Sequence, residues 1–221
     1  MGETTFPRTE RSTILRLPKR GSYDKDVVYA ILDQAIVCHV GLATESGPVV
    51  IPMGYARRGD ELLLHGSARS RLLEEMAGGA PVCVTVTLVD GLVLARSTFH
   101  HSINYRSVVL YGRAVGIDDP VEKAKALEAV VEHLVPGRSR DARPADEGEL
   151  LATRVVRLPI EEASAKIRVG PPIDETRDLE LDIWAGVLPF DRRPGKPLRD
   201  EHTKVGIPVP EYVRNYPEGR T

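Results

Sequence analysis

Residues 36–67 read IVCHVGLATESGPVVIPMGYARRGDELLLHGS, and this stretch decides the fold. It holds three apolar runs of strand length, at residues 36–44, 48–58 and 61–67, which the turn-forming groups SGP and GDE separate. Apolar and β-branched runs that are broken by Gly, Pro and Asp are typical of strands joined by tight turns. The stretch therefore predicts three successive antiparallel strands.

The rest of the chain extends this pattern. Residues 24–35 and 120–135 carry apolar residues at helical spacing, and RLLEEMAGG after the third strand predicts another short helix. Further strands are expected over residues 81–95 and 102–117, with one or two more over residues 152–169. Six or so strands, mostly joined by short turns, predict a mainly β protein of the α+β class that forms an antiparallel barrel, and they argue against a doubly wound parallel sheet.

The length of the chain favours one domain with tails. Its 221 residues, 42% of them hydrophobic, suffice for one substantial core and are too few for two generous domains. Residues 1–22 mix prolines, a glycine and charges without sustained periodicity, which predicts an N-terminal arm. We expect the barrel domain at residues 23–169, followed by a proline-rich tail at residues 170–221 that packs on the barrel or on a partner subunit.

Composition excludes several classes of partner. The formal net charge is −2, and Lys and Arg are spread along the chain, which argues against nucleic-acid binding. No apolar run is long enough to span a bilayer, and the N-terminal residues are polar, so we expect a cytoplasmic protein with no membrane partner. Cys38 and Cys83 lie in apolar runs, which suits buried thiols in a reducing compartment.

The segment HGSARSR connects an expected strand to an expected helix, where free backbone N–H groups favour an anion. Gly66 allows a ligand to approach the backbone closely. Ser67 and Ser70 offer hydroxyl groups to such a ligand. Arg69 and Arg71 can form charge-assisted hydrogen bonds to phosphate oxygens. The segment therefore indicates a phosphate site, and the alternative is a capped surface helix with solvated arginines.

A resemblance to a known family runs from about Val27 to Arg168 and continues in a later tail segment. The stretches that carry it are VCHVGLAT, VVIPMGYARRGDELLLHGSARSRLLEEM and VCVTVTLVDGLVLARSTFHHSINYRSVVLYGRA, and the tail segment is KIRVGPP…WAGVLPF. Together they resemble the pyridoxamine 5′-phosphate oxidase-like flavoproteins, and within them the nitroimidazole-reductase-like branch. The resemblance implies an FMN-binding split β-barrel that forms a homodimer, with FMN in a cleft between the subunits and its phosphate on HGSARSR.

The same resemblance implies roles for individual residues. The implied cofactor-binding residues are Ile51, Pro52, Met53, His65, Gly66, Ser67, Arg69, Arg71, Tyr105, Ser107 and Trp184. The first three would lie against the isoalloxazine ring, and the next five would hold the ribityl phosphate. Tyr105 and Ser107 share one side of a strand that would approach the flavin or the subunit boundary. Trp184 would either stack on the flavin or pack the tail onto the barrel, and no catalytic residue is assigned.

The implied activity is that of an FMN-dependent oxidoreductase. Electrons from a nicotinamide nucleotide would pass through FMN to a small organic acceptor, such as a nitroaromatic compound or a quinone. Two alternatives stay open: a reductase that uses the deazaflavin F420 on the same barrel, and a non-enzymatic flavin- or haem-binding protein. No metal site is expected, because the adjacent His100 and His101 would point to opposite sides of an extended chain. No hydrolase motif competes with this interpretation.

Overall fold

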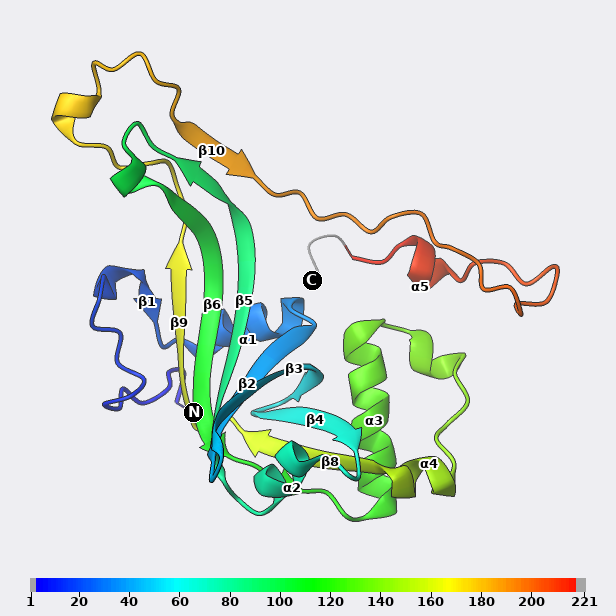
Figure 1. The fold of residues 1–221 in the computed structure, drawn as a ribbon. Coiled ribbons are helices and arrows are strands. Elements are labelled where there is room, and N and C mark those ends of the chain that lie inside the picture. Colours follow the sequence, from blue (N-terminus) through cyan, green and yellow to red (C-terminus); the bar gives the residue numbers. More distant parts are fainter. Residues whose placement is uncertain (1–2, 218–221) are drawn as a thin grey trace.

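The structure is a computed structural model that describes residues 3–217 (Figure 1). Within these residues it contains ten β-strands and five α-helices. The strands are β1 (Gly21–Ser22), β2 (Val37–Thr44), β3 (Gly47–Arg58), β4 (Glu61–Ser67), β5 (Pro81–Leu94), β6 (Ser102–Arg113), β7 (Val115–Gly116), β8 (Thr153–Pro159), β9 (Glu162–Arg168) and β10 (Gly186–Pro189). The helices are α1 (Lys25–Gln34), α2 (Arg71–Ala77), α3 (Pro120–Leu134), α4 (Glu147–Ala152) and α5 (Glu211–Arg214).

All strands belong to one antiparallel sheet, in the order β1-β9-β6-β5-β2-β3-β4-β8-β7, with β10 paired to β5. Strand β3 changes partner along its length: residues Gly47 to Gly54 pair with β2, and Tyr55 begins the pairing with β4. This change of partner folds the sheet back on itself. The predicted α+β class and antiparallel split barrel are confirmed.

The barrel closes where β6 passes β8. A Cβ atom added to Gly112 on β6 would lie 2.9 Å from the Leu158 side chain and 3.1 Å from the carbonyl oxygen of Pro159, both on β8. Only a residue without a side chain allows two strands to approach so closely.

Two hydrophobic clusters fill the molecule. The larger one lies inside the barrel, where α1 contributes Val28, Ile31 and Leu32. The smaller one lies under α3 and includes Leu63 and Val130. Both helices begin at an aspartate cap. The Asp24 carboxylate accepts a hydrogen bond of 2.8 Å from the backbone N–H of Asp26 at the start of α1, and the Asp119 carboxylate accepts one of 2.8 Å from that of Glu122 at the start of α3.

The N-terminal arm packs on the barrel. Phe6 is only 3% exposed, and Arg11 forms an ion pair of 2.9 Å with Glu162 on β9. The arm also contributes β1, which pairs with β9. Residues 1–2 of the predicted arm lie outside the described residues.

The C-terminal tail follows a long path outside the barrel (Figure 1). It first extends the β5–β6 hairpin, where β10 pairs with residues Gly91 to Leu94 of β5. It then crosses to the C-terminal end of α3, where the Tyr216 hydroxyl donates a hydrogen bond of 2.7 Å to the carbonyl oxygen of Leu134. The sequence predicts a largely irregular tail, and β10 differs from that prediction because its partner residues on β5 lie more than 90 residues earlier in the chain.

No helix among residues 3–217 combines the length and apolar character needed to cross a bilayer.

Candidate functional site

The connection between β4 and α2 is a short, ordered loop. Ser70 caps α2, because its hydroxyl oxygen accepts the backbone N–H of Leu73 at 3.4 Å. The Ser67 hydroxyl oxygen accepts the backbone N–H of Arg69 at 3.2 Å. The loop is also tied to the residue before β8, since the Ala68 N–H donates to the Ala152 carbonyl oxygen at 2.8 Å. These bonds fix the position from which the arginine side chains of the loop extend.

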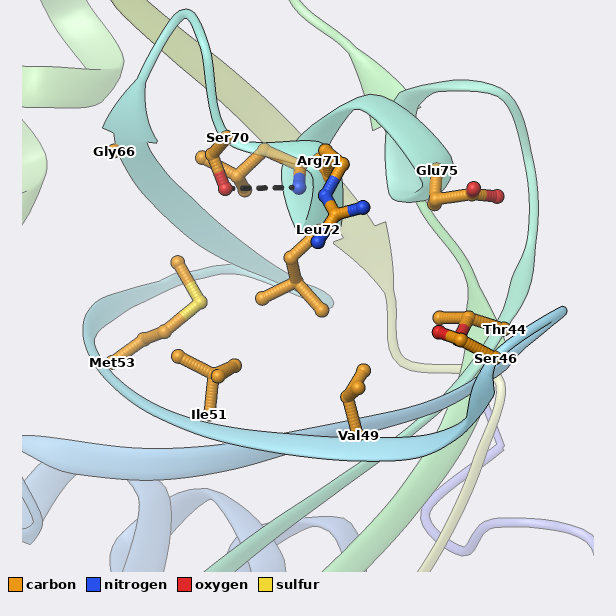
Figure 2. A pocket seen from close by; sticks show the side chains of 11 residues that line it. Thr44, Ser46, Val49, Ile51, Met53, Gly66, Ser70, Arg71, Leu72 and Glu75 are labelled. Atoms are coloured by element: carbon orange, nitrogen blue, oxygen red, sulfur yellow. Dashed lines mark hydrogen bonds between the residues drawn. The ribbon is translucent and has the colours of Figure 1, made fainter.

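A pocket of about 370 Å³ lies between this connection and β3 (Figure 2). Its walls are formed by β3 on one side, by α2 on the other and by the turn between β2 and β3 at one end. The lining residues are Thr44, Ser46, Val49, Ile51, Met53, Gly66, Ser70, Arg71, Leu72, Leu73 and Glu75. In Figure 2, the side chains of Val49, Ile51 and Met53 point from β3 toward Leu72 and Arg71 on α2. The pocket therefore combines an apolar wall with the cationic group of Arg71, and the carboxylate of Glu75 lines it as well.

The alternation of β3 explains the apolar wall. Residues two apart on a strand share a face, so Ile51 and Met53 project to the same side and Pro52 to the other. Pro52 lies opposite His39 of β2, on the outer face of the sheet. Pro52 therefore does not line the pocket, although both of its neighbours do.

Arg69 and Arg71 carry exposed guanidinium groups. Within residues 3–217, neither forms an ion pair or a side-chain hydrogen bond. Other arginines of the sheet are neutralised at short range: Arg57 contacts Asp33 at 2.6 Å, and Arg106 contacts Asp90 at 2.7 Å. The loop thus presents two positive charges that no acidic side chain of the described part of the chain offsets.

Four of the predicted cofactor-binding residues line the pocket together: Ile51, Met53, Gly66 and Arg71. Gly66 allows α2 to pack closely on β4, because an added Cβ would lie 2.9 Å from the Leu73 side chain. Ser67 is the last residue of β4 and Arg69 lies in the loop that follows, and neither lines the pocket.

His65 faces the opposite side of β4 from Gly66. It lies beside Val155 in the register with β8, on the side that packs under α3. Burial lowers the pKa of His65 below its usual value of 6.5, so the imidazole is neutral at pH 7. Its Nδ1 atom is enclosed and has no hydrogen-bond partner in the described residues.

Tyr105, Ser107 and Trp184 lie away from this pocket. Strand β6 is separated from β3 by β5 and β2, and Tyr105 and Ser107 project from its outer face. There the Ser107 hydroxyl donates to the carbonyl oxygen of Lys166 at 3.3 Å. Trp184 is 70% exposed and packs against Gly186 at the start of β10. One chain does not bring these three residues to the Arg71 pocket.

The pocket also contains residues that the sequence did not single out. Val49 shares the face of Ile51 and Met53, so strand alternation could have identified it. Thr44 at the end of β2 and Ser46 in the turn that follows also line the pocket. Their proximity to α2 depends on how the sheet folds back. No local sequence signal carries that information.

In the part of the chain that the structure describes, no three His, Cys, Asp or Glu side chains lie together in a way that could hold a metal ion.

Comparisons with known proteins agree with this architecture. A family model described as pyridoxamine 5′-phosphate oxidase matches residues 24–167. The flavocytochrome Anf3 from Azotobacter vinelandii is 38% identical, with a TM-score of 0.88 over 93% of this chain and 96% of that chain. An FAD and haem binding protein from Mycobacterium smegmatis is 36% identical, with a TM-score of 0.86 over 91% of this chain and 100% of that chain.

A more distant structure is that of a putative 5-nitroimidazole antibiotic resistance protein from Bacteroides thetaiotaomicron. It is 26% identical, with a TM-score of 0.57 over 66% of this chain and 86% of that chain. No curated protein gave a match.

Proposed function

Because the chain belongs to the pyridoxamine 5′-phosphate oxidase family, we propose that it is a flavin-dependent oxidoreductase whose flavin phosphate is bound by Arg71. The observation that carries the proposal is the pocket between β3 and α2, where an arginine without an acidic partner stands beside an apolar wall. A guanidinium can bind a phosphate through two parallel hydrogen bonds. The wall formed by Ile51, Met53 and Leu72 suits a flat aromatic ring.

The identity of the flavin has two candidates. The sequence resemblance favours FMN, and the related Mycobacterium smegmatis protein is named for FAD. Both flavins contain the same ribityl phosphate, so the role proposed for Arg71 covers either of them.

The residues of the chain bind and orient, while a bound flavin supplies the capacity to accept and pass on hydride or electrons. We propose a nicotinamide nucleotide as the donor and a small organic acceptor of the nitroaromatic or quinone type. The similarity to the Bacteroides protein named for 5-nitroimidazole resistance supports this class of acceptor. Cys38 and Cys83 are free thiols, which fits the proposed cytoplasmic location.

We propose that the chain acts as a homodimer. Tyr105, Ser107 and Trp184 lie away from the pocket of their own chain, so they can reach a flavin only at a boundary between subunits. In this arrangement one copy supplies Arg71 and the other supplies the outer face of β6 and the tail. The predicted tail domain then packs on the partner subunit.

A second candidate function is haem binding, because two related structures are a flavocytochrome and an FAD and haem binding protein. A histidine that serves as an axial haem ligand must be neutral and have a free ring nitrogen. His65 fits this need, since its pKa is lowered by burial and no hydrogen bond of the described residues occupies its ring. By contrast, a ring nitrogen of His133 lies 2.8 Å from a carbonyl oxygen, and one of His101 lies 2.9 Å from another.

The test is a set of absorption spectra and flavin titrations of the purified protein. We expect flavin bands that bleach when NADPH is added without oxygen, and a weaker affinity for flavin in Arg71→Ala. Hydrogen bonds to charged groups contribute about 1.5–3 kcal/mol, so the loss should be about 10- to 150-fold. Arg71→Lys should retain part of the affinity, because lysine keeps the charge without the planar fork.

Arg157→Ala is the matched control, because Arg157 is exposed on β8 and projects from the opposite face to the pocket. Unchanged flavin affinity in Arg71→Ala would remove the proposed phosphate site. The same spectra test the haem candidate, for which we expect a Soret band that His65→Ala abolishes. A protein that shows no Soret band after incubation with haem does not have this second function.

A further inference from the structure

A second cavity, of about 670 Å³, lies between α3 and the connection that leads from α3 to α4. After α3 ends, this connection returns alongside the helix to the start of α4 (Figure 1). Neither Arg71 nor His65 lines the cavity, so it is separate from the proposed flavin site and from the haem candidate. The lining residues are Pro120, Val121, Ala124, Lys125, Leu127, Glu128, Val131, Ser139, Ala142, Arg143, Pro144, Ala145, Glu149 and Leu150.

The connection between α3 and α4 is held in its curved path by bonds at both ends. Just after α3, the Glu132 carboxylate accepts the backbone N–H groups of Gly137 and Ser139, at 2.7 and 2.8 Å. Close to α4, the Arg143 guanidinium donates two hydrogen bonds, of 2.6 and 3.0 Å, to the Glu149 carboxylate. The chain itself therefore fixes the shape of the cavity.

The walls of the cavity are mainly apolar. Helix α3 contributes Val121, Leu127 and Val131, and α4 contributes Leu150. The Val121 side chain is 61% exposed. A cavity of several hundred Å³ with apolar walls and a few polar groups is typical of a site for a small molecule.

One carboxylate of the lining has no partner. Lys125 Nζ lies 2.9 Å from a carboxylate oxygen of Glu122, and Arg143 and Glu149 neutralise each other at 2.6 Å. Glu128 is exposed, and it forms no ion pair or side-chain hydrogen bond with any residue between 3 and 217. The charge that is left uncompensated in the lining is therefore negative.

The segment around the cavity adds to this negative charge. Residues 118–150 carry nine acidic and five basic side chains, whereas the whole chain has a formal net charge of only −2. Exposed charges within about 10 Å of one another act together at moderate salt concentration. This part of the molecule therefore attracts cations and repels anions.

From this arrangement we propose that the cavity binds a small organic cation, an amine or a quaternary ammonium compound with an apolar body. The apolar body contacts Val121, Leu127 and Val131, and the positive group lies beside Glu128. A neutral molecule of the same shape gains only the apolar contact, and an anion is repelled. The proposal does not rest on the flavin function, because the two cavities share no residue.

The test uses three probes that share a phenyl ring on a short chain and differ in charge: phenethylamine, phenethyl alcohol and hydrocinnamate. NMR titration of the backbone amide resonances of the full chain gives both the affinity and the position of binding. We expect the amine to bind about 2- to 5-fold more tightly than the alcohol, as an exposed ion pair implies, and the carboxylate to bind most weakly. The resonances that shift should belong to α3, α4 and the connection between them, and added salt should reduce the advantage of the amine.

Glu128→Gln removes the charge and nearly keeps the size of the side chain. It should lower the affinity for phenethylamine to that for phenethyl alcohol and leave the alcohol unaffected. Glu147→Gln is the matched control, because Glu147 is exposed on α4 and does not line the cavity. This control removes the same charge from the same segment, so it should leave the preference for the amine nearly intact.

Four results would overturn the inference: no binding of any probe at millimolar concentration, equal affinities for the three probes, tighter binding of hydrocinnamate, or equal effects of Glu128→Gln and Glu147→Gln. The comparison of probes needs no variant, so it stands even if Glu128→Gln fails to fold. Displacement of the amine by FMN would also contradict the inference, because the amine would then occupy the flavin pocket. Failure of the protein to bind FMN would contradict only the proposed flavin function, so the two failures are distinguishable.

Discussion

At the scale of single residues, His65 has an environment that predicts a dependence of stability on pH. Burial lowers its pKa in the folded protein below the usual 6.5, while the unfolded chain keeps the ordinary value. Between these two pKa values the unfolded state binds more protons than the folded state, so the free energy of unfolding rises with pH there. The contribution is fully present above pH 6.5 and is lost as pH falls through the folded pKa.

We therefore expect urea unfolding midpoints to decrease as the pH is lowered below about 6.5, with the uptake of at most one proton at this site. In His65→Gln, which cannot titrate, this part of the decrease should be absent, while other acid-sensitive groups such as Glu162 still respond at lower pH. Parallel curves for the two proteins between pH 7 and 5 would show that His65 does not contribute.

Much of the pocket could be predicted from the sequence, because the alternation of a strand and the residues preferred at a helix N-terminus are both visible within a few residues. Ile51, Met53, Gly66 and Arg71 line one cavity, and their contact with a flavin stays a prediction. His65 and Gly66 were assigned to the same phosphate, yet adjacent residues of a strand face opposite sides. Thr44 and Ser46 have no local signal, since their proximity to α2 depends on how the sheet folds back.

At the scale of elements, the packing of α2 on β4 depends on the missing side chain of Gly66. A Cβ added there would lie 2.9 Å from Leu73 Cδ1, closer than carbon atoms normally approach, and Leu73 is fully buried. In Gly66→Ala we expect a loss of about 1 kcal/mol or more in the free energy of unfolding, because the overpacked contact shifts α2. Since Arg71 begins α2, flavin affinity should fall as well.

Gly54→Ala is the matched control for this substitution. An added Cβ at Gly54, on β3, meets only the Ile36 carbonyl oxygen at 4.0 Å, so urea unfolding should show little change. If Gly66→Ala and Gly54→Ala have equal stability and equal flavin affinity, the close packing of α2 does not shape the pocket.

Element boundaries show which parts of the fold local sequence can specify. The long strands and α1, α2 and α3 follow from periodicity and turn residues, and they occur where the sequence predicts them. The sequence does not predict the two-residue strands β1 and β7 or the four-residue strand β10 individually. Strands this short contain too few residues to show an alternation of apolar and polar side chains. They form where β9, β8 and β5 each present an edge for pairing.

At the scale of the whole molecule, the tail is fixed at both ends and spans the distance between them (Figure 1). At one end β10 pairs with β5, and at the other the Tyr212 hydroxyl donates to Asp141 at 2.7 Å. Apolar side chains stand in solvent along this path, with Leu198 94% exposed, and Phe99 at the hairpin tip is 88% exposed. These apolar side chains of the tail would be buried if the tail packed against a second copy of the chain.

We accordingly expect light scattering after gel filtration to give twice the 24.3 kDa of one chain. Removal of residues 190–221, which leaves β10 in place, should shift the mass toward the monomer at micromolar concentration and weaken flavin binding at the shared cleft. Arg71→Ala should keep the full dimer mass, because Arg71 is proposed to bind the flavin phosphate and takes no part in the packing of the tail. Two results together would contradict this expectation: a full-length protein that is monomeric, and a truncated protein that binds flavin with unchanged affinity. The entire cofactor site would then lie within one chain.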